Sequence, residues 1–94
     1  MTGGTDDVPY ELLFAPAAAK DLARLRADDS AGLRRTMLGL AFDPRPAGVR
    51  AVAGTRYQRV RVGDLRVIYM IDDDQRRVVI TRIAKRSEHT YRRL

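Results

Sequence analysis

The clearest pattern in the chain is an alternation of apolar and cationic residues on two neighbouring segments. The first segment alternates with period two, which gives it one apolar and one cationic face: Arg59, Val60, Arg61 and Val62. Gly63-Asp64 follows, and glycine at the first central position is typical of a two-residue type II′ turn. The segment 65–71 then returns with Arg66 among apolar residues. The pattern predicts a β-hairpin that gathers three arginines on a rigid sheet, which favours binding of an anion such as a phosphate backbone.

Apolar residues at helical spacing mark two segments in the first half of the chain. Pro16 suits the first turn of a helix that runs to about Ala27, with five residues in its apolar stripe: Ala15, Ala18, Ala19, Leu22 and Leu25. A second helix follows, with three candidate N-caps: Asp28, Asp29 and Ser30. Its apolar positions are Leu33, Met37, Leu40 and Ala41, and Asp43-Pro44 ends it. We expect the two helices to form an antiparallel αα-hairpin.

Three further strands complete the predicted elements. They span 9–14, 49–53 and 77–84, and the last has apolar residues on both faces, with Val78 and Ile80 on one and Val79 and Ile83 on the other. The acidic run 72–75 is interpreted as a hairpin turn, because no further metal ligand is placed near it.

The order of these elements predicts the fold class and the domain organisation. We expect an α+β fold in which an N-terminal strand and an αα-hairpin pack on a twisted, mostly antiparallel sheet of four to five strands. Residues 1–8 are expected to be a disordered tail, residues 9–94 a single domain, and residues 87–94 one or two helical turns.

Composition and charge narrow the classes of function. The chain has no cysteine and one histidine, so we expect no disulfide, no zinc cluster, no thiol nucleophile and no cofactor. No apolar run approaches the roughly 20 residues of a membrane span, and the N-terminus does not resemble a signal peptide, so we expect a cytoplasmic protein. Residues 1–44 hold five basic and seven acidic side chains, whereas residues 45–94 hold thirteen and five. A polyanion is therefore the natural partner of the C-terminal half.

Four segments resemble the RelE/ParE superfamily of bacterial toxins from type II toxin–antitoxin systems, and the resemblance spans residues 10–92. These segments are 20–25, 43–48, 59–69 and 83–92. RelE-like members cut mRNA in the ribosomal A site, whereas ParE-like members poison DNA gyrase. The basic strand pair, Arg66, Arg86 and Tyr91 place this chain on the RelE-like side. The resemblance implies a ribosome-dependent endoribonuclease (an mRNA interferase) that acts on ribosome-bound mRNA, and a cognate antitoxin in a heterodimer or heterotetramer.

The resemblance also implies a role for each residue of the site. Arg66 and Arg86 would hold the scissile phosphate, and Tyr91 would orient or deprotonate the 2′-hydroxyl or stack on a base. Arg59 and Arg61 occupy the places of the basic strand pair, where some relatives have lysine. Four further cations are expected to contact RNA: Arg56, Arg82, Lys85 and Arg92.

The strand pair and a neighbouring leucine depart from the family pattern. Arginine stays protonated, so Tyr91, Lys85 or His89 would have to act as the base. Leu65 stands where the family often has an aromatic residue, and we expect it to be a packing change.

A structural role is the alternative for several of these residues. Arg59 and Arg61 also suit a solvated strand face, and Arg66 suits an ion pair with Asp64 or Asp72. Tyr91 also suits a packing anchor, and Tyr57 and Tyr69 suit the core or its rim. The alternative functions are a ParE-like DNA gyrase inhibitor and a non-catalytic RNA-binding or degenerate toxin.

Overall fold

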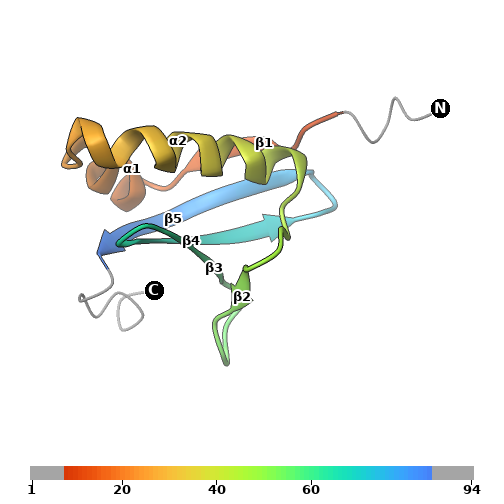
Figure 1. The fold of residues 1–94 in the computed structure, drawn as a ribbon. Coiled ribbons are helices and arrows are strands. Elements are labelled where there is room, and N and C mark those ends of the chain that lie inside the picture. Colours follow the sequence, from red (N-terminus) through yellow and green to blue (C-terminus); the bar gives the residue numbers. More distant parts are fainter. Residues whose placement is uncertain (1–7, 86–94) are drawn as a thin grey trace.

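The computed structural model describes residues 8–85 of the chain, and within this range two helices cover one face of a five-stranded sheet (Figure 1). The elements follow in the order β1 (Glu11–Phe14), α1 (Pro16–Ala23), α2 (Ala27–Phe42), β2 (Arg50–Ala51), β3 (Gln58–Val62), β4 (Leu65–Asp72) and β5 (Arg77–Lys85). This arrangement confirms the predicted α+β fold and its helical hairpin. The predicted tail, apart from Val8, and the segment 87–94 lie outside the described residues.

The strands are ordered β1-β5-β4-β3-β2 across the sheet. The pairs β2–β3, β3–β4 and β4–β5 are antiparallel, whereas β1 and β5 are parallel. The last strand therefore lies inside the sheet, as its apolar residues on both faces predict. In the described part of the chain, no helix is long and apolar enough to cross a membrane.

The β3–β4 hairpin has the predicted turn. Val62 pairs with Leu65, which leaves Gly63 and Asp64 as a two-residue loop. Gly63 has a φ of +57°. Asp64 does not have a positive φ, since Arg76 is the only non-glycine residue within 8–85 that does. The positive φ is thus confined to the first central residue of the turn, as a type II′ turn requires.

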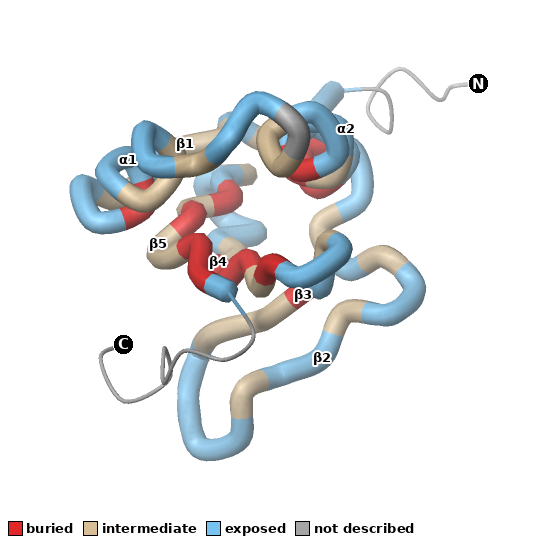
Figure 2. The backbone as a smooth tube through the Cα atoms, turned by 60° about the vertical axis from the view of Figure 1, so that its left-hand side comes forward, coloured by how far each residue is buried: buried red, intermediate tan, exposed pale blue. Residues whose placement is uncertain are grey.

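The core lies between the helices and the sheet, where Figure 2 shows the buried residues of α2, β4 and β5 facing one another. Its fully buried side chains include Leu33 and Leu40 from α2 and Tyr69 from β4. The predicted apolar positions of the second helix are all buried. Leu65 is 2% exposed within this core, which confirms that it has a packing role.

The predicted boundary between the two helices was wrong. α1 ends at Ala23 rather than near Ala27, and α2 begins at Ala27 after Arg26, without a side-chain cap. The candidate caps at 28–30 therefore lie inside the first turn of α2, where the Ser30 hydroxyl donates to the Ala27 carbonyl at 2.9 Å. Leu25, in the short connection, packs against the core. The contact of this partly buried leucine with the core accounts for the chain reversing before the capping residues.

The predicted face of Ile83, opposite to Val78 and Ile80, was also wrong. The register of β4 and β5 shifts between Ile68 and Tyr69: Ile68 pairs with Arg82, whereas Tyr69 pairs with Ile80. The extra residue, Thr81, is a β-bulge whose hydroxyl donates to the Ile68 carbonyl at 3.0 Å. The bulge moves Ile83 onto the helix-covered face, where it joins the core.

Candidate nucleic-acid interface

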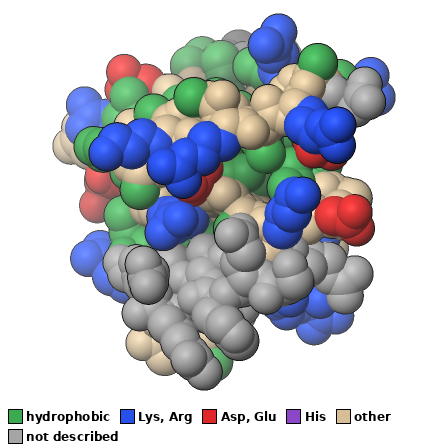
Figure 3. Space-filling view, turned by 90° about the vertical axis from the view of Figure 1, so that its left-hand side faces the viewer, with side chains coloured by type: hydrophobic (Ala, Val, Ile, Leu, Met, Phe, Trp, Pro, Cys, Tyr) green, Lys and Arg blue, Asp and Glu red, His purple; other side chains and the backbone are tan. Residues whose placement is uncertain are grey.

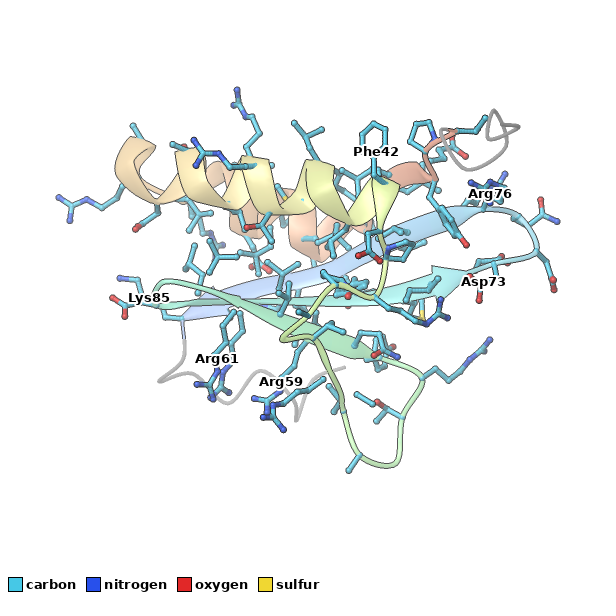
Figure 4. All side chains as sticks on the ribbon, turned by 45° about the vertical axis from the view of Figure 1, so that its right-hand side comes forward. Phe42, Arg59, Arg61, Asp73, Arg76 and Lys85 are labelled. Atoms are coloured by element: carbon cyan, nitrogen blue, oxygen red, sulfur yellow. The ribbon has the colours of Figure 1, made fainter. Side chains whose placement is uncertain are left out.

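The three arginines of the predicted hairpin lie on one face of the sheet, opposite the helices. Their neighbours Val60, Leu65 and Val67 point into the helix-covered core, so the alternating positions point the other way. Figure 4 shows Arg59 and Arg61 extending from β3 on the side away from the helices. Arg61 pairs directly with Arg66 across the hairpin, so the structure brings these side chains to one surface as the sequence predicts.

A fourth arginine, Arg50, shares this face and was missed by the sequence analysis. It pairs with Arg59 across β2 and β3, and opposite residues of antiparallel strands point to the same side. Arg50 lies within the predicted strand 49–53, but its neighbours become visible only once the register is known. We call these four residues, Arg50, Arg59, Arg61 and Arg66, the arginine row.

The arginine row consists of two like-charged cross-strand pairs. Arg50 faces Arg59 and Arg61 faces Arg66. Like charges directly opposite each other on a sheet are destabilising, by roughly the few tenths to 1 kcal/mol that a favourable pair contributes. Two such pairs gather four guanidinium groups on one face, an arrangement that suits binding of an anion.

A hollow of about 430 Å³ adjoins the arginine row. Arg50, Arg59 and Arg61 line it together with Val60, Ala47 and Gly48. One wall is the turn 46–49, in which the Val49 amide donates to the Pro46 carbonyl at 3.2 Å. Gly48 has a φ of +90°, which suits the third position of a type II turn. The hollow thus combines cationic side chains with a wall of small residues.

The loop that forms this wall is held at two points. The buried Tyr69 hydroxyl donates to the Pro44 carbonyl at 2.7 Å, and burial raises the pKa of Tyr69 to about 12. The Arg45 guanidinium donates to both carboxylate oxygens of Asp73, at 2.9 and 3.3 Å. The Tyr10 hydroxyl donates to the same carboxylate at 2.7 Å. The loop 43–48 is therefore tied to β4 and to the β4–β5 turn.

Hydrogen bonding sets the ionisation of this cluster. The bond from Arg45, followed by that from Tyr10, lowers the pKa of Asp73. The Tyr10 hydroxyl donates to an ionised carboxylate, which raises the pKa of Tyr10. The Arg76 guanidinium lies 4.5 Å from the centre of the Tyr10 ring. These groups form an anchoring cluster near the acidic turn, in which the cations are balanced by a carboxylate.

Arg82 and Lys85, two of the predicted RNA contacts, lie near the end of β5. Arg82 forms a two-pronged ion pair with Asp21 of α1, with N–O distances of 2.9 and 3.3 Å. Both side chains help to line a hollow of about 200 Å³ that also includes Arg24. Figure 3 shows Lys and Arg side chains gathered across this end of the molecule. An RNA-binding role for Arg82 stays a prediction, and its ion pair also gives it a structural role.

Of the remaining predicted site residues, Arg56 alone lies within the described part of the chain. Arg56 lines a separate hollow of about 520 Å³, whose other walls include Met70, Val79 and the acidic residues 72–74. Arg86, His89, Tyr91 and Arg92 lie outside the described residues. Arg86 directly follows Lys85, and the neighbouring Ala84 pairs with Arg66, so β5 ends beside the hairpin arginines. Within residues 8–85, no three His, Cys, Asp or Glu side chains are arranged to hold a metal ion.

Comparisons with known proteins assign the chain to a family. The family model described as ParE toxin of type II toxin-antitoxin system, parDE, matches residues 12–90. The curated Toxin RelE of Mycobacterium tuberculosis is 36% identical over 85 residues, which cover 88% of either chain. The crystal structure of the toxin–antitoxin complex RelBE2 from the same species aligns with a TM-score of 0.75 and 28% identity, over 84% of this chain and 100% of that one.

A more distant structure shows the same fold. The intact Escherichia coli RelBE toxin–antitoxin complex aligns with a TM-score of 0.74 over 84% of this chain and 99% of that one, at 17% identity. With the family match over most of the sequence, these findings establish that the chain belongs to the RelE/ParE superfamily of type II toxin–antitoxin toxins.

Proposed function

We propose that the chain is a RelE-like endoribonuclease that cuts mRNA in the ribosomal A site and thereby inhibits translation. The observation that carries the proposal is the pairing of Arg61 with Arg66 on the sheet face away from the helices. These are positions to which the family resemblance gives contacts with the RNA. The 36% identity to a protein named Toxin RelE supports a RelE-like rather than a ParE-like function. A toxin with this target would act in the cytoplasm, where ribosomes translate.

The proposed reaction is attack of a 2′-hydroxyl on the adjacent phosphorus. The hydroxyl loses its proton, the new P–O bond forms, and the bond to the 5′-oxygen breaks as that oxygen takes up a proton. Arg61 and Arg66, with Arg86, would hold the phosphate and stabilise the negative charge that develops on it. This scheme needs no metal or cofactor. Because arginine stays protonated, we assign the base to Tyr91, Lys85 or His89.

The proposal includes an antitoxin partner. Two of the similar structures are complexes of a toxin with its antitoxin. On α2, Leu38 and Phe42 are 55% and 66% exposed, and Figure 4 shows Phe42 pointing away from the sheet. One helical turn before Leu38 lie the exposed Arg34 and Arg35. This mixture suits an acidic, amphipathic segment of an antitoxin, in a heterodimer or heterotetramer.

Primer extension on ribosome-bound reporter mRNA tests the proposal. The wild-type chain is expected to cut at A-site codons, and Arg66→Ala to reduce the cleavage rate by about a hundredfold, the effect of losing one group that stabilises transition-state charge. Tyr91→Phe tests the predicted contact outside the described residues. Arg26→Ala removes an exposed arginine from the connection between α1 and α2 and serves as a control that should cut normally. Growth arrest with uncut mRNA would refute the nuclease.

Inhibition of DNA gyrase is the second candidate function. The matching family model is described as a ParE toxin, which favours this alternative. In that case the arginines form a binding surface, and cells that express the chain would accumulate cleaved DNA while their mRNA stays intact. A chain that binds RNA without cutting mRNA or damaging DNA would be a degenerate toxin.

A further inference from the structure

We infer that Asp73 is a positioning residue of the proposed nuclease: through Arg45 it fixes the loop 43–48, which forms one wall of the hollow beside the arginine row. The inference rests on the proposed function, because it gives a residue distant from the hairpin a role in RNA cleavage. Asp73 does not line this hollow itself. It lies in the turn after β4, at the end of the sheet far from Arg61 (Figure 4). Its effect on cleavage would therefore pass through the loop.

Three hydrogen bonds from two side chains meet at the Asp73 carboxylate. Arg45 donates to both of its oxygens, at 2.9 and 3.3 Å, and Tyr10 donates to one of them at 2.7 Å. The Arg76 guanidinium lies 4.5 Å from the centre of the Tyr10 ring and also donates to the Val8 carbonyl. The carboxylate thus joins the loop to the residues before β1 and to the β4–β5 turn. Because a two-pronged bond fixes the plane of the guanidinium, it sets the orientation of Arg45 as well as its distance.

The loop is stiff enough to carry this constraint from Arg45 to the hollow. Pro44 and Pro46 flank Arg45, and the proline ring fixes φ at both positions. The turn 46–49 then closes with a backbone hydrogen bond of 3.2 Å. This turn supplies two of the residues that line the hollow, Ala47 and Gly48. A change in the anchor of Arg45 should therefore move the wall as a unit.

The ion pair between Arg45 and Asp73 is poorly placed to stabilise the fold as a whole. The two side chains are 55% and 54% exposed. Exposed ion pairs contribute little to the free energy of unfolding, because water and salt screen the charges. The loop is also attached to the core by the hydrogen bond from Tyr69 to Pro44. Replacement of Asp73 should therefore leave the domain folded while the wall beyond Pro44 loses its second anchor.

The position of the wall matters because the proposed reaction needs the 2′-hydroxyl, the phosphorus and the 5′-oxygen in line. The hollow, of about 430 Å³, adjoins the sheet face at which the proposed function places the RNA. A fixed wall restricts the orientations that a nucleotide can take there. Misplacement of a reacting group by about 1 Å can cost about a hundredfold in rate. Because the loop would keep its bond to Tyr69, we expect a smaller loss, of about tenfold.

Single-turnover cleavage of ribosome-bound reporter mRNA tests the inference, with the full chain in excess and its concentration varied. Asp73→Asn should lower the rate at saturating toxin about tenfold and leave the half-saturating toxin concentration unchanged, because the complex forms with the RNA misplaced. A purely structural role predicts the reverse, since a smaller folded fraction raises the half-saturating concentration without changing the maximal rate. Asp74→Asn removes the same charge from the next exposed residue of the turn and should behave as wild type.

A double-mutant cycle separates positioning from a direct contact of Arg45 with RNA. If the two residues act through their ion pair, Arg45→Ala and Asp73→Asn each lower the maximal rate, and the double variant is no slower than the slower single variant. Arg45→Lys keeps the charge but lacks the fork, so its rate should lie between those of wild type and Arg45→Ala. Additive losses would overturn the inference, as would equal maximal rates of Asp73→Asn and Asp74→Asn.

Hydrogen exchange of the Val49 amide, followed by NMR, tests the position of the loop without a cleavage assay. This amide closes the turn 46–49, so its exchange should be several-fold faster in Asp73→Asn than in Asp74→Asn. Unchanged exchange would refute the link between Asp73 and the wall, whether or not the wild type cuts mRNA. A wild type that cuts no mRNA would refute the nuclease and the role in cleavage, while faster exchange would keep Asp73 as the residue that fixes the loop.

Discussion

Replacing Asp21 tests how the fold holds its first helix against the sheet. β1 pairs with β5 only as far as Ile80, and the chain then turns into α1. Beyond that point the Asp21 carboxylate binds the edge of β5. It accepts a hydrogen bond from the Ile83 amide at 2.9 Å and two from the Arg82 guanidinium at 2.9 and 3.3 Å. One carboxylate therefore replaces the missing strand partner. Asp21→Ala should loosen α1 from β5 and destabilise the whole domain.

The expected magnitude follows from the burial of these groups. The side chains of Asp21 and Arg82 are 11% and 28% exposed. Breaking a fully buried pair costs about 3–5 kcal/mol, and a hydrogen bond to a charged group contributes about 1.5–3 kcal/mol. Because Arg82 can partly regain water, we expect the free energy of unfolding to fall by about 2–4 kcal/mol. For a chain of this size the thermal midpoint should fall by about 10–20 °C.

Thermal and urea denaturation followed by circular dichroism provide the assay, with Glu11→Ala as the matched control. Glu11 pairs with Arg77 at 3.1 Å, a similar distance, but these side chains are 60% and 46% exposed. An exposed pair contributes about 0–1 kcal/mol, so Glu11→Ala should change stability little. Asp21→Asn, which keeps an acceptor for the Ile83 amide, should fall between the two. Equal losses in Asp21→Ala and Glu11→Ala would refute the reasoning.

Two further predictions concern the cluster that anchors the loop 43–48. The pKa of Asp73 is lowered by Arg45 and then by Tyr10, so its contribution to stability is present above the usual carboxyl pKa near 4 and is lost as the pH falls through the lower folded value. Denaturation midpoints of Asp73→Asn should therefore lie below wild type at pH 6 and converge with it in acid; a constant gap would count against this. Burial raises the pKa of Tyr69 to about 12, so the folded state favours the protonated phenol, and this stabilisation is lost as the pH rises from about 10 to about 12. Tyr69→Phe should cost about 1 kcal/mol at neutral pH, because the Pro44 carbonyl loses its donor, and should show a shallower alkaline loss in urea titrations.

The hairpin and the second helix were predictable because local chemistry determines them. Glycine at position 63 is needed for a positive φ, and valines alternate with arginines at the period of a strand. Leu33, Met37 and Leu40 follow the helical period and are all buried. In each case the preference of the local sequence agrees with the tertiary packing, so pattern alone was sufficient.

The helix boundary, the bulge and Arg50 were not predictable because distant contacts determine them. The chain turns at Leu25, which is partly buried against the core, rather than at the capping residues, whose contribution is only about 1 kcal/mol. The bulge at Thr81 depends on how β5 meets β4, and nothing in the local sequence indicates it. Arg50 joins the candidate site only through its register with Arg59, which spans nine residues of sequence.

The distribution of charge separates the parts of the molecule that hold the fold from those suited to binding. Three ion pairs within the described residues join elements distant in sequence: Glu11–Arg77, Asp21–Arg82 and Asp73–Arg45. Each places a carboxylate where two elements must be held together. The arginine row does the opposite, since its cross-strand partners repel each other across β2, β3 and β4. A fold that had evolved for stability alone would place threonine or valine at these positions, because both suit cross-strand pairs. A bound anion would offset this repulsion, which fits the RNA contacts of the proposed function.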